Sequence, residues 1–176
     1  MKGFTRENQW LSLCGLNCGL CPMFLGKHCG GCGNGNQTCK TARCSLEHGG
    51  VEYCFQCGEY PCETYQHIDD YDSFITHRRQ KADLEKAKTT GLEQYNLEQR
   101  EKARILDFLL STCNDGRRKT FFCAAVNLLE LADLQAVVQE LDRNASSTKE
   151  RCLYVVNAFQ EIAERKNILL KLNKKR

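Results

Sequence analysis

The chain has 176 residues, of which 41% are hydrophobic and 27% charged, and its formal net charge is +3. These values are ordinary for a globular chain of one domain or two small ones, and no apolar run is long enough for a transmembrane helix. The cysteine count is the departure, because 10 of the 13 cysteines lie between Cys14 and Cys62.

The first residues favour a reducing compartment. Basic residues near the N-terminus are not followed by an apolar stretch, so the sequence predicts no signal peptide and a cytoplasmic location. In that compartment a high density of cysteines indicates metal ligation or thiol chemistry, whereas in an exported protein it would indicate disulfides. We therefore predict a protein that binds metal through cysteine thiolates.

Residues 1–64 are expected to form a small cysteine-rich module supported by metal. This segment is rich in cysteine and glycine and has few large apolar side chains. About fifty residues of that composition cannot offset their conformational entropy by burial alone, and metal–thiolate bonds would supply the missing stabilisation. The expected fold resembles a zinc ribbon or zinc knuckle, and the glycines would allow tight turns around the ligands.

The charge distribution argues against nucleic acid as the partner of this module. Residues 1–64 carry five Lys or Arg and five Asp or Glu, so they are neutral before any metal is bound. A divalent ion held by four thiolates leaves a site charge of about −2, so bound metal would make the module acidic. Nucleic acid is therefore an unlikely ligand of the cysteine-rich face, and a protein partner is the alternative.

Residues 65–176 are expected to form an all-α domain of about four to five helices. Glycine becomes rare there, and the pattern predicts helices over residues 71–88, 97–112, 119–130, 134–144 and 148–172. Capping residues are expected at Asn96 with Gln99, at Asp133, and at Ser147 with Glu150. The three remaining cysteines fall on apolar faces of these helices and are expected to be small buried hydrophobes, with Cys123 as a candidate for facing the metal module (Cys113, Cys123, Cys152).

The clustered cysteines form three groups. They read Cys14-Gly-Leu-Asn-Cys18-Gly-Leu-Cys21-Pro22, then Cys29-Gly-Gly-Cys32-Gly33 followed by Cys39 and Cys44, then Cys54-Phe-Gln-Cys57-Gly58-Glu-Tyr-Pro-Cys62. Two groups contain Cys-x-x-Cys-Gly, in which both sulfurs can reach one ion while the glycine turns backbone N–H groups toward them. The first zinc site is therefore predicted at Cys29, Cys32, Cys54 and Cys57.

Six clustered cysteines remain for a second tetrathiolate site. Cys18, Cys21 and Cys62 are the first choices, and the fourth ligand would be Cys14, Cys39 or Cys44. A two-metal cluster that shares thiolates is an open alternative. His28 and His48 lie in the same segment, but with ten thiols available they are better explained as loop residues.

An iron–sulfur cluster is the alternative cofactor. The spacing Cys14-x3-Cys18-x2-Cys21 matches that of radical-SAM enzymes, but those enzymes need a large α/β barrel and this chain is too short. Cysteine followed by proline also occurs in ferredoxins, so a [4Fe–4S] redox protein or sensor remains a second interpretation. A third is thiol–disulfide or metal-transfer chemistry at Cys54 and Cys57. No catalytic constellation is evident, so an enzyme is not predicted.

Taken in order, these motifs resemble an uncharacterised prokaryotic family, domain of unknown function 3795. The resemblance rests on Cys14–Pro22, Cys29–Cys32 and Cys54–Cys62, and on the later stretch from Gly116 to Cys123 before Asn127-Leu128-Leu129. It covers roughly residues 12–130. It implies a cysteine-rich protein that binds zinc, and it implies no activity.

Overall fold

The computed structural model describes residues 2–35, 37–144 and 147–175, and across these ranges it contains helices and no β-strand. The cysteine-rich region holds the single 3-10 turns η1 (Cys18–Leu20), η2 (Cys54–Gln56) and η3 (Glu63–Tyr65), and the short helices α1 (Pro22–Leu25) and α2 (Lys40–Glu47). The helices after it are α3 (Gln80–Thr90), α4 (Leu92–Thr112), α5 (Lys119–Leu128), α6 (Leu131–Asn144) and α7 (Thr148–Arg165). The expected helical part with about five helices is thus confirmed.

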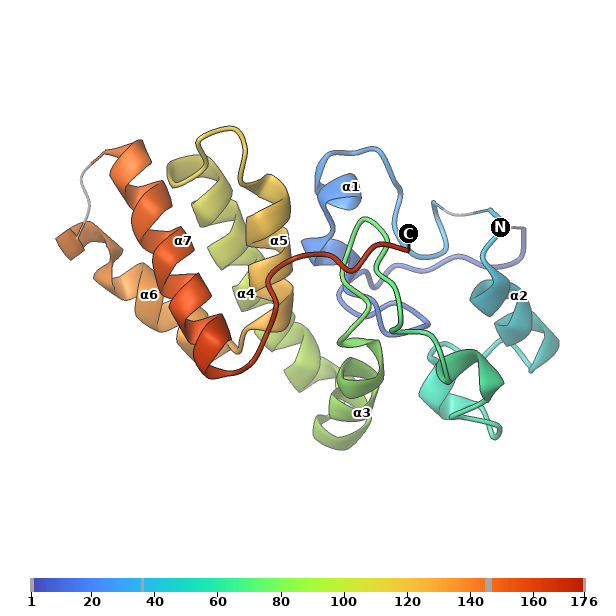
Figure 1. The fold of residues 1–176 in the computed structure, drawn as a ribbon. Coiled ribbons are helices and arrows are strands. Elements are labelled where there is room, and N and C mark those ends of the chain that lie inside the picture. The colour runs from blue at the N-terminus through green and yellow to red at the C-terminus, as the bar shows by residue number, and fades with distance from the viewer. Residues whose placement is uncertain (1, 36, 145–146, 176) are drawn as a thin grey trace.

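Helices α4 to α7 pack into a bundle, and the cysteine-rich region lies beside it, with α1 next to α5 (Figure 1). The main core is formed by apolar faces of these four helices, on which Leu109, Phe122 and Phe159 are fully buried. Leu20 of the cysteine-rich region is part of the same core. As expected, the cysteines of the helical part are buried small side chains in it (Cys113, Cys123, Cys152).

A second core joins the cysteine-rich region to α3 and the start of α4. Leu11 and Tyr53 pack there against Leu84 and Tyr95, all with at most 1% of their surface exposed. A third cluster of Phe4, Leu13 and Ala42 lies within the cysteine-rich region itself. Burial shared across the predicted boundary therefore supplies part of the apolar core that residues 1–64 lack on their own.

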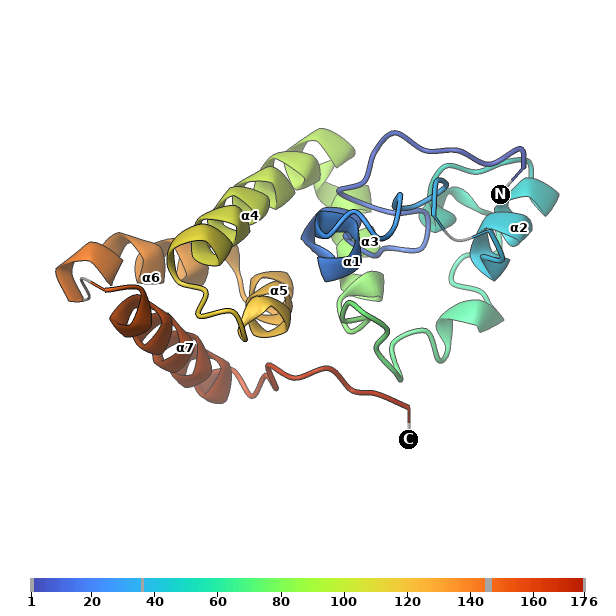
Figure 2. The same cartoon turned by 90° about the horizontal axis from the view of Figure 1, so that it is seen from above.

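The first predicted helix, over residues 71–88, is wrong in its first nine residues, because α3 begins at Gln80. Residues 70–78 instead bond to the C-terminal tail, residues 166–175, which runs from α7 back across them (Figure 2). The backbone N–H of Asp72 donates to the carbonyl of Asn173 at 2.7 Å. The backbone N–H of Asn173 donates in return to the carboxylate of Asp72 at 2.8 Å. The guanidinium of Arg78 donates to the carbonyls of Leu169 and Lys171.

The last helix is correspondingly shorter than predicted. The capping box of Ser147 and Glu150 is confirmed, with bonds of 3.0 and 3.3 Å. The predicted apolar stripe is buried as far as Ala163, but α7 ends at Arg165 and Asn167 has a left-handed φ of 55°. Beyond the helix end Leu169 is 66% exposed, whereas Ile168 and Leu170 are partly buried and pack against the main core.

Two other predicted helix starts are also wrong. Helix α4 begins at Leu92, after Gly91 with φ 87°, so Asn96 and Gln99 lie inside it and do not cap it. Both side chains instead contact the cysteine-rich region, at Asn8 and at Asn17 respectively. Helix α6 begins at Leu131, so Asp133 lies in its first turn, where its carboxylate pairs with Lys166.

Candidate metal centre

Two of the Cys-x-x-Cys units form the same tight turn. The backbone N–H of Cys21 donates to the carbonyl of Cys18 at 3.0 Å, and that of Cys57 donates to Cys54 at 3.1 Å. Each turn is a single 3-10 turn that places its two cysteines at its ends. This is the local geometry that lets two sulfurs face one point, as the spacing predicted. Of the two predicted knuckles, Cys54–Cys57 forms this turn and Cys29–Cys32 does not, because the N–H of Cys32 donates to the side-chain oxygen of Gln9 at 2.7 Å. The described part of the chain has none of the strands of a zinc ribbon.

Four cysteines line one cavity of about 120 Å³ at the edge of the cysteine-rich region. Cys44 comes from α2, and the other three come from η2 and the loop that follows it. The thiol of Cys44 is close enough to those of Cys62 and Cys57 for their charges to interact, and Cys54 interacts with Cys62 and Cys44. We call these four the outer set (Cys44, Cys54, Cys57, Cys62).

A further four cysteines are linked by pairwise charge interactions, and two of them, Cys14 and Cys18, lie in the segment that contacts α3 and α4. Cys14 interacts with Cys39, Cys32 interacts with both of them, and Cys18 interacts with Cys32 and Cys14. Cys32 and Cys39 also pack against the same small cluster around Leu13. We call these four the inner set (Cys14, Cys18, Cys32, Cys39).

The two sets are neighbours. The backbone N–H of Cys54 donates to the carbonyl of Leu13 at 2.9 Å, and the thiols of Cys54 and Cys14 interact. The grouping differs from the one favoured by spacing: Cys32 lies with the inner set, and Cys29 and Cys32 are absent from the cavity that Cys54 and Cys57 line. Cys62 likewise lies with the outer set and not beside Cys18 and Cys21.

Two predicted ligands fall outside both sets. Cys21 precedes α1 and interacts with Cys18 and with Cys123 of α5, so Cys123 does face the cysteine-rich region. Cys29 lies beyond the end of α1, where its sulfur accepts a backbone hydrogen bond from Gly31 at 3.4 Å. All thirteen cysteines are free thiols.

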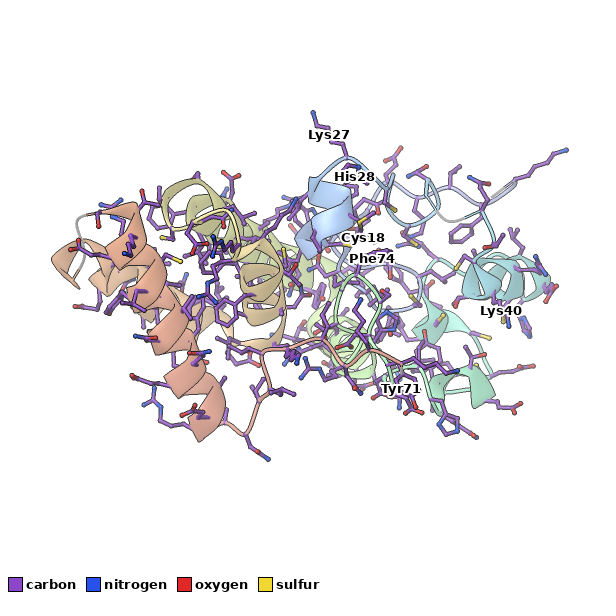
Figure 3. All side chains as sticks on the ribbon, turned by 45° about the horizontal axis from the view of Figure 1, so that its top comes forward. Cys18, Lys27, His28, Lys40, Tyr71 and Phe74 are labelled. Carbon is purple, nitrogen blue, oxygen red and sulfur yellow. The ribbon has the colours of Figure 1, made fainter. Side chains whose placement is uncertain are left out.

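Neither loop histidine belongs to a ligand set as the side chains stand. His28 is exposed next to α1 (Figure 3). His48 is one of the residues that line the outer cavity. The Nδ1 atom of His48 is 3.6 Å from the sulfur of Cys44, and its Nε2 atom is 3.4 Å from a carboxylate oxygen of Glu59. His48 is therefore a neighbour of a candidate ligand.

Burial dominates the electrostatics of both sets. It raises the pKa of Cys18 and of Cys54 to about 12 and that of Cys32 to about 11, and repulsion between neighbouring thiolates adds to the effect. A thiol whose pKa is raised is a poor nucleophile, which weakens the thiol–disulfide hypothesis for Cys54. A bound cation between the sulfurs would reverse both the desolvation cost and the repulsion.

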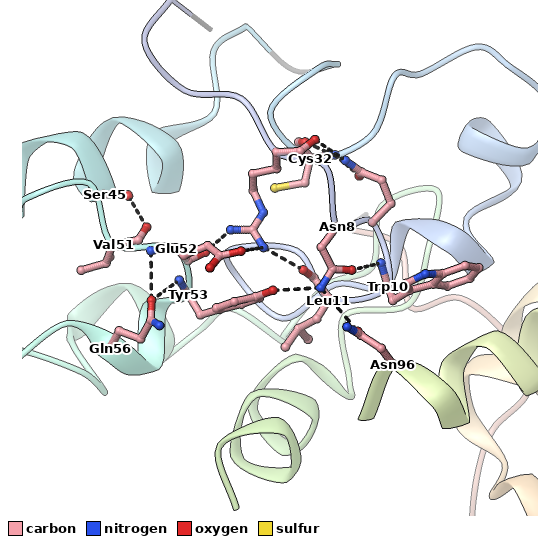
Figure 4. Close-up of polar contacts among 12 residues, drawn as sticks. Asn8, Trp10, Leu11, Cys32, Ser45, Val51, Glu52, Tyr53, Gln56 and Asn96 are labelled. Carbon is pink, nitrogen blue, oxygen red and sulfur yellow. Dashed lines mark hydrogen bonds and ion pairs between the residues drawn. The ribbon is translucent and has the colours of Figure 1, made fainter. Parts of the chain in front are cut away.

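A buried arginine, Arg6, lies near Cys32 of the inner set, and its partners Leu11, Glu52 and Tyr53 are labelled in Figure 4. The guanidinium of Arg6 donates to the carbonyl of Glu52 and, at 3.2 Å, to that of Leu11, and it lies 4.4 Å from the ring centre of Tyr53. Its positive charge lowers the pKa of Cys32 against the larger effect of burial. Sequence spacing gave no signal for Arg6, because it stands eight residues before the first cysteine.

The donor atoms can be tested against a metal ion. As placed, no three His, Cys, Asp or Glu side chains of the described residues converge closely enough to hold an ion, so ligation would require the sulfurs to close in. The hydroxyl of Tyr65 favours such a state. It is buried, it has no hydrogen-bond partner of ordinary geometry among the described residues, and it approaches the sulfur of Cys54. A metal-bound thiolate at Cys54 would accept that hydrogen bond.

Sequence reasoning missed the polar residues that attach the candidate centre to the helices. The amide of Gln80 donates to the carbonyl of Cys14 at 3.1 Å, and Asn17 donates to Gln99 at 2.8 Å. A signal was available for Gln99, because it falls at helical spacing on the same buried face of α4 as Tyr95 and Leu106. A polar residue on such a face requires a buried partner.

Comparisons of the chain with family models, with curated proteins and with solved structures give no match. The resemblance to domain of unknown function 3795 therefore stays a prediction. None of the helices in the described ranges is both long enough and apolar enough to cross a membrane.

Proposed function

We propose that this protein binds two metal ions through two sets of four cysteine thiolates, with the outer set holding one ion and the inner set the other. The observation that supports it most is that the four cysteines of the outer set line a single cavity, and the charge interactions that link the cysteines of the inner set support the second site. Four thiolates are the ligand number of a structural zinc site.

Zinc is the ion that the donor atoms favour. Thiolates select soft or borderline ions, and four sulfurs in a tetrahedral arrangement are typical of zinc or of iron–sulfur clusters. The radical-SAM spacing would place Cys14, Cys18 and Cys21 on one cluster, and Cys21 interacts both with Cys18 and with Cys123 of α5. An iron–sulfur cluster stays the alternative, and the metal analysis below distinguishes the two.

The role of these ions would be to hold residues 14–62 in shape beside the helical bundle and to present a surface to a protein partner. Few large apolar side chains are available to this segment, so metal–thiolate bonds would provide much of its stability. We further propose that the protein acts in the cytoplasm, where these thiols stay reduced.

The test is elemental analysis with a visible spectrum on protein purified without oxygen. About two zinc ions per chain and no visible absorbance would support the proposal. If the protein contains iron and an equal amount of sulfide, the cofactor is an iron–sulfur cluster and not zinc. If it contains no metal, the proposal is contradicted.

Substitutions assign the ions to the two sets. We expect Cys57→Ser to lose the outer ion and Cys18→Ser to lose the inner ion, each leaving about one zinc per chain. Cys29→Ser is the matched control, because it changes a half-buried cysteine that belongs to neither set. Loss of zinc in the control, with retention in Cys57→Ser, would contradict the grouping.

A further inference from the structure

The C-terminal tail, residues 166–175, carries four lysines and no acidic residue. The first of them, Lys166, pairs with Asp133 of α6. The other three are exposed and have no carboxylate partner among the described residues (Lys171, Lys174, Lys175). Three uncompensated positive charges therefore lie on one short stretch of the surface.

Two exposed aromatic rings border the tail. Phe74 is 61% exposed and Tyr71 is 49% exposed, and neither ring is part of the three apolar cores formed by the described residues (Figure 3). The ammonium of Lys174 lies 5.5 Å from the ring centre of Phe74, and that of Lys175 lies 5.9 Å from the ring centre of Tyr71. Each ring thus has a cation beside it and about half of its surface or more open to solvent.

Hydrogen bonds hold the rings beside the lysines. Asn173 donates from its backbone N–H to the carboxylate of Asp72 at 2.8 Å and from its side-chain amide to the carbonyl of Asp70 at 2.7 Å. The ammonium of Lys174 donates to the carbonyl of Ser73. The two pairs of ring and lysine are therefore ordered before any ligand arrives, which lowers the entropy cost of binding.

The acidic side chains close to the rings already have partners. Asp72 is buried and pairs with Arg78 at 3.7 Å, and Asp69 pairs with a lysine of α3 at 2.7 Å. Asp70 lies 2.9 Å from a ring nitrogen of His67. These contacts offset the negative charge next to the tail, so the lysines give this surface its sign.

We propose that the tail and residues 70–78 form a binding surface for a single strand of nucleic acid. Its bases would stack on Phe74 and Tyr71, and its phosphates would contact the lysines of the tail. Exposed aromatic rings combined with cations are how proteins bind single strands without reading their sequence. The charge argument against nucleic acid at the cysteine-rich face does not apply here, because residues 65–176 hold the whole net charge of +3. The proposal goes beyond the proposed function and does not depend on bound metal.

The rings favour a single strand over other anionic partners. Every nucleotide of a single strand carries a planar base and a negative phosphate, and the surface presents a ring beside an ammonium twice. A duplex keeps its bases stacked on one another, so it leaves the exposed rings without a ligand. An anionic membrane offers charge to the lysines but no planar group to the rings.

The experiment measures binding of two fluorescein-labelled probes to the full-length protein by fluorescence anisotropy. The probes are oligouridylate and oligothymidylate of about twelve nucleotides. We expect both to bind, because neither stacking nor phosphate contacts involve the 2′-hydroxyl, and a duplex of the same length to bind more weakly. If three lysines contact phosphates, the logarithm of the binding constant should fall against the logarithm of the salt concentration with a slope of about −2.

Substitutions separate stacking from charge. Phe74→Leu keeps an apolar side chain but removes the aromatic face, so binding should weaken at least about fivefold, whereas Phe74→Trp should retain it. Lys174→Ala should weaken binding and make the salt slope shallower by about 0.7. Circular dichroism and thermal melting of each variant confirm that it is folded.

Two matched controls lie on α7. Leu153→Ala removes an apolar side chain with the same 61% exposure as Phe74, and Lys149→Ala removes an exposed lysine at the end of α7 opposite the tail. Both should bind the probes as the unchanged protein does. If Lys149→Ala weakens binding as much as Lys174→Ala, the attraction is not localised at the tail and the proposal is wrong.

Three further outcomes would overturn the proposal. Unchanged affinity of Phe74→Leu, or a duplex that binds as tightly as the single strands, would show a general attraction for polyanions. Absence of binding to either probe at about 50 mM salt would exclude a nucleic-acid surface. Binding to phosphatidylserine vesicles without binding to the probes would identify an anionic membrane as the ligand of this surface.

Discussion

Lys102 is a fully buried cation on α4, next to the contact between the bundle and the cysteine-rich region. Its ammonium donates to the carbonyl of Leu129 at 2.8 Å, just past the end of α5. Burial lowers its pKa to about 8, and repulsion from Arg79 adds to this, against attraction from Asp83 and two glutamates. The ammonium thus provides a hydrogen bond for a carbonyl at the end of α5, and the cost is the burial of its positive charge.

The burial of this lysine predicts how the stability of the protein depends on pH. Because the folded pKa lies below the ordinary lysine value, the unfolded chain binds more protons than the folded one between about pH 8 and pH 10.4. The free energy of unfolding should therefore rise across this window, relative to Lys102→Met, by at most about 3 kcal/mol. Urea unfolding of both proteins at several pH values measures it.

Lys88→Met serves as the control for this prediction, because it removes an exposed ammonium from α3. Its free energy of unfolding should stay parallel to that of the unchanged protein. If the difference between Lys102→Met and the unchanged protein is constant from about pH 7 to pH 10, Lys102 keeps its proton in the folded state and the prediction is wrong.

The turn at one cysteine pair was predictable at this scale, but the grouping of the cysteines was not. The spacing of Cys54 and Cys57 predicted a tight turn that the structure contains. It could not predict that Cys44 would share their cavity, because Cys44 reaches it through the position of α2. That position depends on the burial of Phe4, Leu13 and Ala42, which carry no periodic signal in so short a segment.

At the scale of elements, the C-terminal tail replaces a helix that the sequence predicted. The carboxylate of Asp72 is buried and accepts backbone hydrogen bonds from His77 at 2.7 Å and from Asn173 at 2.8 Å. The bond to Asn173 joins residues 101 positions apart, and the bond to His77 closes a local turn. They hold residues 71–79 out of a helix, since the backbone polar groups there have partners elsewhere.

Asp72→Asn should therefore loosen the tail. An amide has one acceptor oxygen where the carboxylate has two, so one buried N–H loses its charged partner, at a cost of about 2 kcal/mol. Urea unfolding measures the loss, and hydrogen exchange at the amide of Asn173 should become faster. Asp70→Asn, which alters an exposed pair with His67, should change stability little. Equal effects of the two substitutions would contradict this account.

Helix existence was predictable, and helix ends were less so. Ser147 and Glu150 form the expected cap, and both residues are exposed. Asn96 and Gln99 have the same pattern, yet tertiary contacts with Asn8 and Asn17 use them. A capping motif is therefore informative only where no neighbouring segment competes for its side chains.

At the scale of the whole molecule, the two halves share their cores. Leu20 lies in the core of the bundle, and Leu11 and Tyr53 lie in a second core with Leu84 and Tyr95. Sequence analysis recognised the change in composition near residue 65 but not this shared burial, because nothing in a local pattern indicates which distant face an apolar residue will cover. The helical part nevertheless has a large core of its own, from α4 to α7.

Removal of metal should therefore affect the two halves unequally. We expect a chelator to release residues 14–62 from their fold, since few large apolar side chains then hold this segment. Helices α4 to α7 should stay folded, because their core is lined by their own apolar faces. Hydrogen exchange with mass spectrometry, before and after chelation, reports each segment separately. The same chelator saturated beforehand with zinc is the control. Simultaneous loss of protection in α5 and α7 would show that the ions support the whole fold, and unchanged protection in residues 14–62 would show that burial alone holds the cysteine-rich region.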